Sequence, residues 1–173
     1  MHCSIPESQS KPEWRFAVDS EYNRPMLSIS HTLTGAFIAS KLGSPVLYIP
    51  LTLASHYLED WIPHKDVGTG LSTGRRKKST AIILEFGELA VSFILLYLFF
   101  QYGHAEIRWP IWIAAFVALV PDFLEAPRNF LHWEPAFFRP FNDFHHMFHH
   151  STMNWVVGLL PQVLLVMVIW FLR

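Results

Sequence analysis

The chain has 173 residues, of which 51% are hydrophobic and 16% aromatic, and its formal net charge at pH 7 is −1. This length is typical of one domain, and the apolar content makes a membrane protein the first class to consider. A charge near zero, without an extended basic face, excludes a typical nucleic-acid-binding protein. The single cysteine, Cys3, excludes an intrachain disulfide and a site built from several thiolates.

Five apolar segments follow a polar stretch of 25 residues. They cover residues 26–42, 45–62, 80–101, 110–126 and 154–172. The third and fifth are long enough, at about 1.5 Å per residue, to cross a hydrocarbon core of about 30 Å, and they are apolar on every face. The sequence therefore predicts an all-α, multi-pass membrane bundle of about five helices. Residues 1–25 form its polar tail, and residues 26–173 form a single membrane domain.

The connections between these segments have recognisable breaks. Ser44 and Pro45 follow Gly43 as a helix N-cap and first helical residue, which predicts a tight hairpin between the first two helices. Pro63 ends the second segment. The longest connection, residues 127–153, is rich in Pro, Phe and His and is long enough to carry a site.

Lysine and arginine are distributed unequally between the two ends of the predicted helices. Ten lie on the side of the N-terminal tail and three on the other side. The excess of positive charge on cytoplasmic loops places the N-terminus in the cytoplasm, for a protein of the inner membrane of the cell. The basic run that ends at Lys78 serves as this orientation signal or, alternatively, contacts anionic lipid headgroups.

Helix parity gathers the ionisable residues at one membrane boundary. In a five-span chain, the starts of odd helices and the ends of even helices lie on one side. The residues that this rule brings together are His31, His56, Asp60, His64, Glu85, Glu88, Asp122, Glu125, His145, His146, His149 and His150. We therefore expect a shared site at the cytoplasmic boundary.

The block from His56 to His64 has the clearest helical spacing. His56 and Asp60 are four residues apart and project from one helix face, as two ligands of one ion require. An alternative is a carboxylate that only orients a buried imidazole. Glu59 points about 100° away and is expected at the solvent or lipid interface. His64 follows Pro63 and is expected to act as a secondary ligand or proton donor.

Four histidines occupy six positions in the last connection. His145, His146, His149 and His150 have spacings that share helical faces, which favours metal binding over a pH-responsive surface cluster. The predicted carboxylates have simpler interpretations as well.

Glu85 and Glu88 lie inside a predicted span, where a carboxylate needs a partner or a wet cavity. A salt bridge is the simple alternative for Glu85, and termination of the fourth helix is the simple alternative for Pro121 and Asp122. As part of a site, Glu85 or Glu88 is the expected general base.

Nitrogen and oxygen ligands suit zinc, iron or manganese, and residue types alone do not choose among them. The number of candidate ligands exceeds what one zinc needs, which favours two ions that activate water and clamp the oxygens of a phosphoryl or acyl centre. At the edge of a bilayer, the expected partners are membrane lipids, and the expected substrate is a lipid headgroup or lipid-linked ester.

The chain resembles the bacterial membrane-bound metal-dependent hydrolases, whose active site is similar to that of zinc-dependent phospholipase C. The resemblance covers roughly Ser30 to Ser151. It rests on four motifs: Ser30-His31, Ser55-His56-x-x-x-Asp60-x-x-Pro63-His64, Pro121-Asp122 and the late histidines. It implies hydrolase activity, zinc as the ion, and a ligand set of His31, His56, Asp60, Asp122 and members of the group from His145 to His150.

Two other functions remain open at the level of sequence. The spacing His146-x-x-His149-His150 matches one histidine box of a di-iron membrane hydroxylase or desaturase. A non-enzymatic membrane protein with a pH-sensitive histidine cluster is the second alternative. The residues do not determine the oligomeric state.

Overall fold

The computed structural model describes residues 28–65, 71, 76–150, 152 and 154–173. The predicted polar tail and most of the basic loop lie outside the described residues. The described part is all-helical and contains six α-helices. This is one helix more than the sequence predicted.

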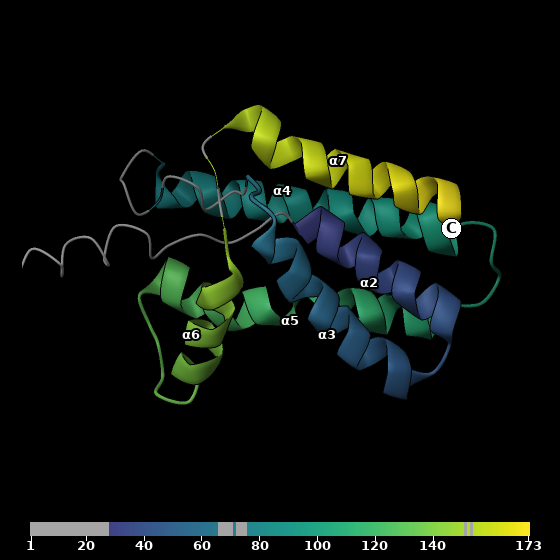
Figure 1. Cartoon of the computed structure of the whole chain (residues 1–173), viewed down its shortest axis with the longest axis horizontal. Helices are drawn as coiled ribbons and strands as arrows, with labels where there is room; N and C mark the ends of the chain where they lie inside the picture. The colour runs from purple at the N-terminus through teal and green to yellow at the C-terminus, as the bar shows by residue number, and fades with distance from the viewer. Residues whose placement is uncertain (1–27, 66–70, 72–75, 151, 153) are drawn as a thin grey trace, which may run out of the picture.

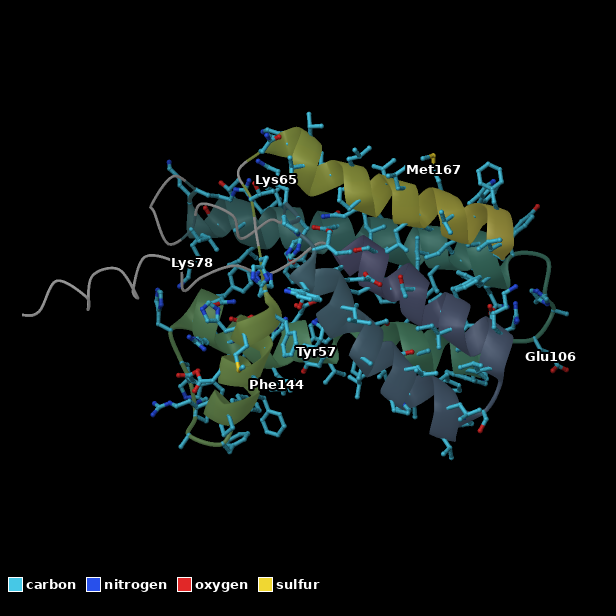
Figure 2. The ribbon with its side chains drawn as sticks, in the orientation of Figure 1. Tyr57, Lys65, Lys78, Glu106, Phe144 and Met167 are labelled. Atoms are coloured by element: carbon cyan, nitrogen blue, oxygen red, sulfur yellow. The ribbon has the colours of Figure 1, made fainter. Side chains whose placement is uncertain are left out.

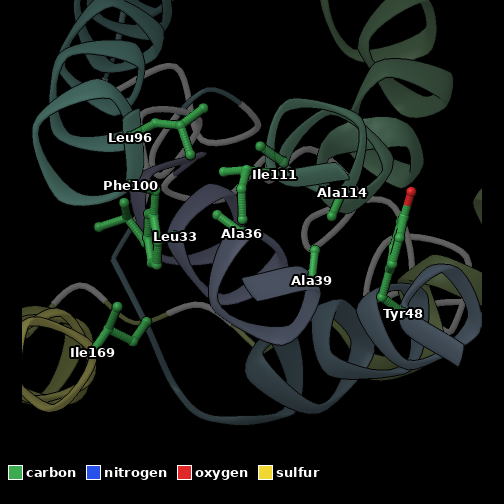
Figure 3. Close-up of a cluster of buried hydrophobic side chains, with 10 residues drawn as sticks. Leu33, Ala36, Ala39, Tyr48, Leu96, Phe100, Ile111, Ala114 and Ile169 are labelled. Atoms are coloured by element: carbon green, nitrogen blue, oxygen red, sulfur yellow. The ribbon is translucent and has the colours of Figure 1, made fainter. Parts of the chain in front are cut away.

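Helix α2 (Ser28–Leu42) is the centre of the bundle (Figure 1). It packs against α3, α4, α5 and α7, and its side chains are buried on most faces. Leu33 and Ala36 lie at the middle of the apolar core (Figure 3). A Cβ atom on Gly35 would lie 2.7 Å from the carbonyl oxygen of Ala114, so glycine permits the close approach of α2 and α5.

Helix α3 (Pro45–Trp61) forms the predicted hairpin with α2. Gly43 turns the chain with a positive φ of 66°, a conformation that glycine adopts without strain. Ser44 is the extended N-cap residue, and Pro45 begins the helix. The predicted break between these helices is therefore confirmed.

Helix α4 (Lys78–Leu96) continues into a π-helical turn, η1 (Tyr97–Gln101). Helix α5 (Trp109–Leu131) contains Pro121 and Pro127 and ends five residues beyond the predicted segment. The predictions that the fourth helix ends near Ala126 and that Pro127 begins the connection are therefore wrong. Proline is tolerated inside membrane helices because neighbouring groups satisfy the freed backbone atoms.

The additional helix, α6 (Arg139–Phe148), lies within the predicted long connection. It covers the end of the bundle at which α3 finishes (Figure 1). The side chain of Asn154 accepts hydrogen bonds from the amides of Val156 and Val157 and caps α7 (Trp155–Leu172). The chain therefore folds back over the bundle end before its last helix.

Three helical segments are long and apolar enough to cross a membrane: Lys78–Gln101, Trp109–Leu131 and Trp155–Leu172. Helices α2 and α3 have 15 and 17 residues. At about 1.5 Å per residue, they are shorter than a hydrocarbon core of about 30 Å. The described bundle therefore combines three helices of membrane-spanning length and composition with the shorter hairpin α2–α3, which packs against them.

Candidate metal centre

Seven ionisable side chains meet at the end of the bundle where α2 begins and α3 ends. They form three overlapping groups in which the ligand-type atoms lie within 4.8 Å of one another. The groups are His56, Asp60 and His145; Asp60, His64 and His149; and His31, His56 and Asp122. The predicted convergence of widely separated residues is therefore present in the fold.

The first group surrounds Oδ2 of Asp60. This oxygen lies 2.6 Å from Nε2 of His145 and 3.2 Å from Nε2 of His56. The two Nε2 atoms lie 3.2 Å apart. His56 and Asp60 project from one face of α3, as their spacing predicted, and α6 supplies His145.

The second group lies beside the first and shares Asp60. Nε2 of His64 lies 3.3 Å from Nε2 of His149. The backbone holds them there, because the amide of His150 donates to the carbonyl of Asp60 and the amide of His64 donates to the carbonyl of His150. Gly158 allows the chain at His64 and Lys65 to lie on α7, since a Cβ atom there would be 2.6 Å from that of Lys65.

The third group joins α2, α3 and α5. The ring of His31 stacks on that of His56 with 4.0 Å between centroids, and Nε2 of His31 lies 3.2 Å from Oδ1 of Asp60. Oδ1 of Asp122 lies 3.9 Å from Nε2 of His56 and 3.8 Å from Nε2 of His145. The carboxylates of Asp60 and Asp122 therefore both lie beside the imidazoles of His56 and His145.

Three of the histidines have a carboxylate or carbonyl oxygen close to Nδ1, the ring nitrogen that faces away from the cluster. Nδ1 of His31 lies 3.0 Å from Glu59, and Nδ1 of His145 lies 3.1 Å from Glu125. Nδ1 of His64 donates to the carbonyl of Ile62 at 2.8 Å. An acceptor at one nitrogen selects the tautomer that presents the other to a metal.

The role of Glu59 corrects the expectation from sequence. Its side chain is only 11% exposed and contacts His31, whereas helical geometry alone placed it at the solvent or lipid interface. Its partner comes from α2, so no local spacing within α3 could reveal the contact. Arg128 was also overlooked, although a cation three residues after Glu125 in an apolar helix is a usable signal.

Arg128 and aromatic contacts hold α6 in place. The guanidinium of Arg128 lies 3.2 Å from Glu134, just before α6, and 3.8 Å from Asp143 within it. The ring of Tyr57 on α3 packs edge to face on Phe144 of α6, with 5.1 Å between centroids (Figure 2). These contacts position His145 over Asp60.

The buried nitrogen and oxygen atoms have the chemistry and spacing of a site that is able to hold a metal ion. Ligands at about 2.0–2.1 Å from a tetrahedral zinc lie about 3.3 Å from one another, close to the observed separations of Nε2 atoms. Burial lowers the pKa of His64 and that of His149, which keeps both rings neutral, as a ligand must be. The residues present therefore fit a divalent metal.

His145 carries a proton in the metal-free protein. Burial by itself lowers the pKa of this imidazole, but the interactions with Asp60 and Glu125 outweigh burial and raise it to about 10. The 2.6 Å contact with Asp60 has the length of a charge-assisted hydrogen bond. A metal ion at Nε2 of His145 must displace this proton.

Several predicted site residues lie outside the three groups. His150 is exposed, with Nδ1 donating to the carbonyl of Phe148, and His146 is half-buried on α6. The described residues therefore do not bring the proposed histidine box together as a unit. Glu88 is buried in α4, and Glu85 accepts a hydrogen bond of 2.9 Å from the hydroxyl of Ser28.

Two apolar cavities reach the cluster from the sides. One, of about 420 Å³, lies between α4 and α5 and contains Glu85 and Asp122 in its wall. The other, of about 290 Å³, lies against α7 and contains Glu59 and His64 in its wall. The cluster is thus buried in the protein but borders spaces suited to apolar groups.

The chain matches no protein-family model, no curated protein and no solved structure. Buried imidazoles and carboxylates that converge at hydrogen-bonding distance are able to hold a divalent cation, and the neighbouring Glu85 is able to accept a proton.

Proposed function

We propose that this protein is a membrane-embedded, metal-dependent hydrolase that cleaves a phosphodiester or ester in a lipid-like substrate. One observation carries the proposal: His31, His64 and His145 each direct Nε2 into one buried cluster, while an oxygen atom lies within 3.1 Å of each Nδ1. This is the usual arrangement of histidines that bind a catalytic metal. The resemblance to membrane-bound metal-dependent hydrolases supports the same class.

Two ions, with zinc as the first choice, account best for the ligand set. A single zinc takes three or four protein ligands, whereas seven side chains converge here. Asp60 belongs to two groups through different partners, so its carboxylate suits a bridge between two ions. His56, His145 and His31 would hold one ion with Asp122, and His64 and His149 the other.

Hydrolysis requires a water oxygen to bond to phosphorus or to the acyl carbon while the ester bond to the leaving alcohol breaks. Bound divalent ions lower the pKa of water and neutralise charge on the oxygens of the reacting centre. Glu85 is the candidate base that takes the proton from water, because it lies in the wall of the cavity that reaches Asp122. Glu85 then returns this proton to the departing alkoxide, which leaves as an alcohol.

The position of the cluster at one end of the membrane helices supports a substrate at the membrane boundary. The distribution of Lys and Arg favours the cytoplasmic side of the inner membrane for this end. A scissile ester at this depth belongs to a molecule that partitions into the bilayer. Membrane lipids and lipid-linked esters have this property.

Metal content and hydrolysis in the same preparation test the proposal. Protein purified in detergent should contain stoichiometric zinc, iron or manganese and should hydrolyse a phosphodiester such as phosphatidylglycerol after loading with zinc. His56→Ala should lose both properties. His104→Ala, an exposed histidine outside the cluster, should retain both. Wild-type protein without bound metal and without hydrolysis would refute the proposal, whereas iron with oxygen consumption would favour the oxidative alternative.

A further inference from the structure

Helix α6 has three distinct faces when its residues are placed at intervals of about 100° around the helix axis. One face is buried and polar, and it contains Asn142 and His145. A second face is exposed and polar, and it contains Arg139 and Asp143. The third, which we call the outer apolar face, consists of Phe141, Phe144 and Met147, with Phe137 just before the helix. The centres of the three faces are about 120° apart.

The distribution of side chains on α6 is the reverse of that on a helix of a soluble protein. A helix at the surface of a soluble protein buries its apolar face and exposes its polar face. In α6, Asn142 and His145 are 1% and 2% exposed, whereas Phe141 and Met147 are 58% and 71% exposed. Transfer of apolar surface out of water is favourable. The outer apolar face is therefore suited to contact with hydrocarbon and not to contact with water.

The outer apolar face is joined to the apolar surface of α3. The centroid of the Tyr57 ring on α3 lies 5.1 Å from that of Phe144 and 5.5 Å from that of Phe148. The next residue of α3, Leu58, is 62% exposed. One apolar surface therefore extends from the hairpin α2–α3 onto α6.

The contacts of His145 place α6 beside α5 and not beyond its end. Nδ1 of His145 lies 3.1 Å from Glu125, and Nε2 lies 3.8 Å from Oδ1 of Asp122. Counted from Trp109 at the start of α5, Asp122 and Glu125 lie about 20 and about 24 Å along the helix, at about 1.5 Å per residue. Tryptophan is enriched at membrane boundaries, and Trp109 is 62% exposed. With Trp109 at the far boundary of a hydrocarbon core of about 30 Å, α6 lies about 6–10 Å inside the near boundary.

We propose that α6 is an interfacial helix whose outer apolar face lies among the acyl chains of the membrane leaflet. Helices of this kind bury their apolar face about 5–10 Å into the boundary between headgroups and acyl chains, which agrees with the depth counted along α5. Figure 1 shows α6 lying across the long helices, as a helix in the plane of the membrane does. This position of α6 does not depend on the proposed hydrolase function. The leaflet supports the helix that carries His145 to Asp60.

The acyl chains of the leaflet fit the outer apolar face better than two other partners. The exposed polar face carries one cation, Arg139, and one anion, Asp143, so it gives α6 no excess positive charge for anionic headgroups. Lipid tails are as apolar as leucine, so an apolar face gains little when it exchanges lipid for a second copy of the chain. The three candidate spans already place lipid at this depth. Apolar contact with the leaflet is therefore sufficient to hold α6.

Spin labelling of the full chain in phosphatidylcholine vesicles tests this position. Cys3→Ser removes the single native cysteine, so each added cysteine carries the only label. Phe141→Cys and Met147→Cys report the outer apolar face, Arg139→Cys reports the polar face, and Val163→Cys reports an exposed position on the candidate span α7. Oxygen concentrates in hydrocarbon, whereas chromium oxalate stays in water. The ratio of relaxation by oxygen to relaxation by chromium oxalate should be higher on the outer apolar face than at Arg139→Cys and should approach the ratio at Val163→Cys.

Any of three results would overturn the proposal. A ratio on the outer apolar face no higher than at Arg139→Cys would place this face in water. Weak relaxation by both reagents would show that protein covers it, and a high ratio only in vesicles that contain phosphatidylglycerol would indicate attraction to anionic headgroups. Met147→Cys decides if the two apolar positions differ, because Met147 is more exposed than Phe141. The measurement needs neither metal nor substrate, so its outcome is separate from that of the hydrolase test.

Discussion

Nε2 of His145 and Oδ2 of Asp60 lie 2.6 Å apart, although 85 residues separate them along the chain. This contact joins α6 to the end of α3, and the side chain of Asp60 is completely buried. The same carboxylate contacts His31 and His56. Asp60 is therefore the residue on which the whole cluster is centred.

Asp60→Asn should abolish binding of both proposed ions. Asparagine preserves the shape of the side chain but removes the negative charge that two groups share. Affinity for zinc should fall by more than about 100-fold, since partners outside the coordination shell alone contribute about 10–100-fold. Zinc titration with a competing chelator measures this loss. Glu106→Gln, at the opposite end of the bundle (Figure 2), should bind zinc normally. Normal affinity in Asp60→Asn would remove Asp60 from the site.

Glu125→Gln should weaken zinc binding without removing a ligand. Glu125 lies 3.1 Å from Nδ1 of His145, and the amide would no longer stabilise the orientation and basicity of that ring. The expected loss is about 10–100-fold in affinity, with stoichiometry unchanged at saturating zinc. A titration measures both quantities. Loss of stoichiometry would instead identify Glu125 as a ligand.

Gly158→Ala should disturb the position of His64. The added Cβ would lie 2.6 Å from Cβ and 2.7 Å from the amide nitrogen of Lys65. Such overpacking typically costs about 1–3 kcal/mol. Thermal unfolding in detergent should show a lower midpoint, and metal analysis should show weaker binding of one ion. Gly87→Ala is the matched control, because its Cβ would meet nothing within 4 Å. Equal midpoints in the two variants would contradict the proposed contact.

Zinc binding should release the proton held by His145. Because the pKa of His145 is raised to about 10 in the metal-free fold, this ring is protonated at neutral pH, and zinc affinity should rise with pH up to that value. Calorimetry in buffers of different ionisation enthalpy counts the released protons. Fewer than about one proton per protein at neutral pH would contradict the assignment of His145 as a ligand.

Above neutral pH, the stability of the metal-free protein should fall as pH rises, whereas zinc affinity should rise. The folded pKa of His145 exceeds the unfolded value of about 6.5, so its stabilising contribution is complete below about pH 6.5 and is lost as pH rises towards 10. For His64 and His149 the folded pKa is lowered, so their contribution is lost as pH falls below about 6.5. Thermal midpoints of chelator-treated protein should therefore be highest near about pH 6.5 and should decline at higher and at lower pH.

Local patterns in the sequence were sufficient to predict the helical class and the hairpin at Gly43. They also predicted the end of the bundle at which the ionisable residues meet. The physical reason is that apolar length, helix breakers and helix parity depend on short stretches of chain and on the bilayer. His56 and Asp60 share a face because helical periodicity alone requires it. Zinc binding, a lipid substrate and a cytoplasmic site are still predictions, which the experiments above address.

Only the tertiary structure decided which histidines meet and what supports them. Helix α6 depends on contacts of Arg128 and Tyr57 with residues distant along the chain, and no local pattern records such contacts. The same is true of Glu59, whose partner belongs to another helix. The spacing of the late histidines allowed several pairings, but packing against α3 turns His145 and His149 inward and leaves His150 exposed. Burial against a particular neighbour is a property of the assembled bundle, whereas periodicity is a property of each segment.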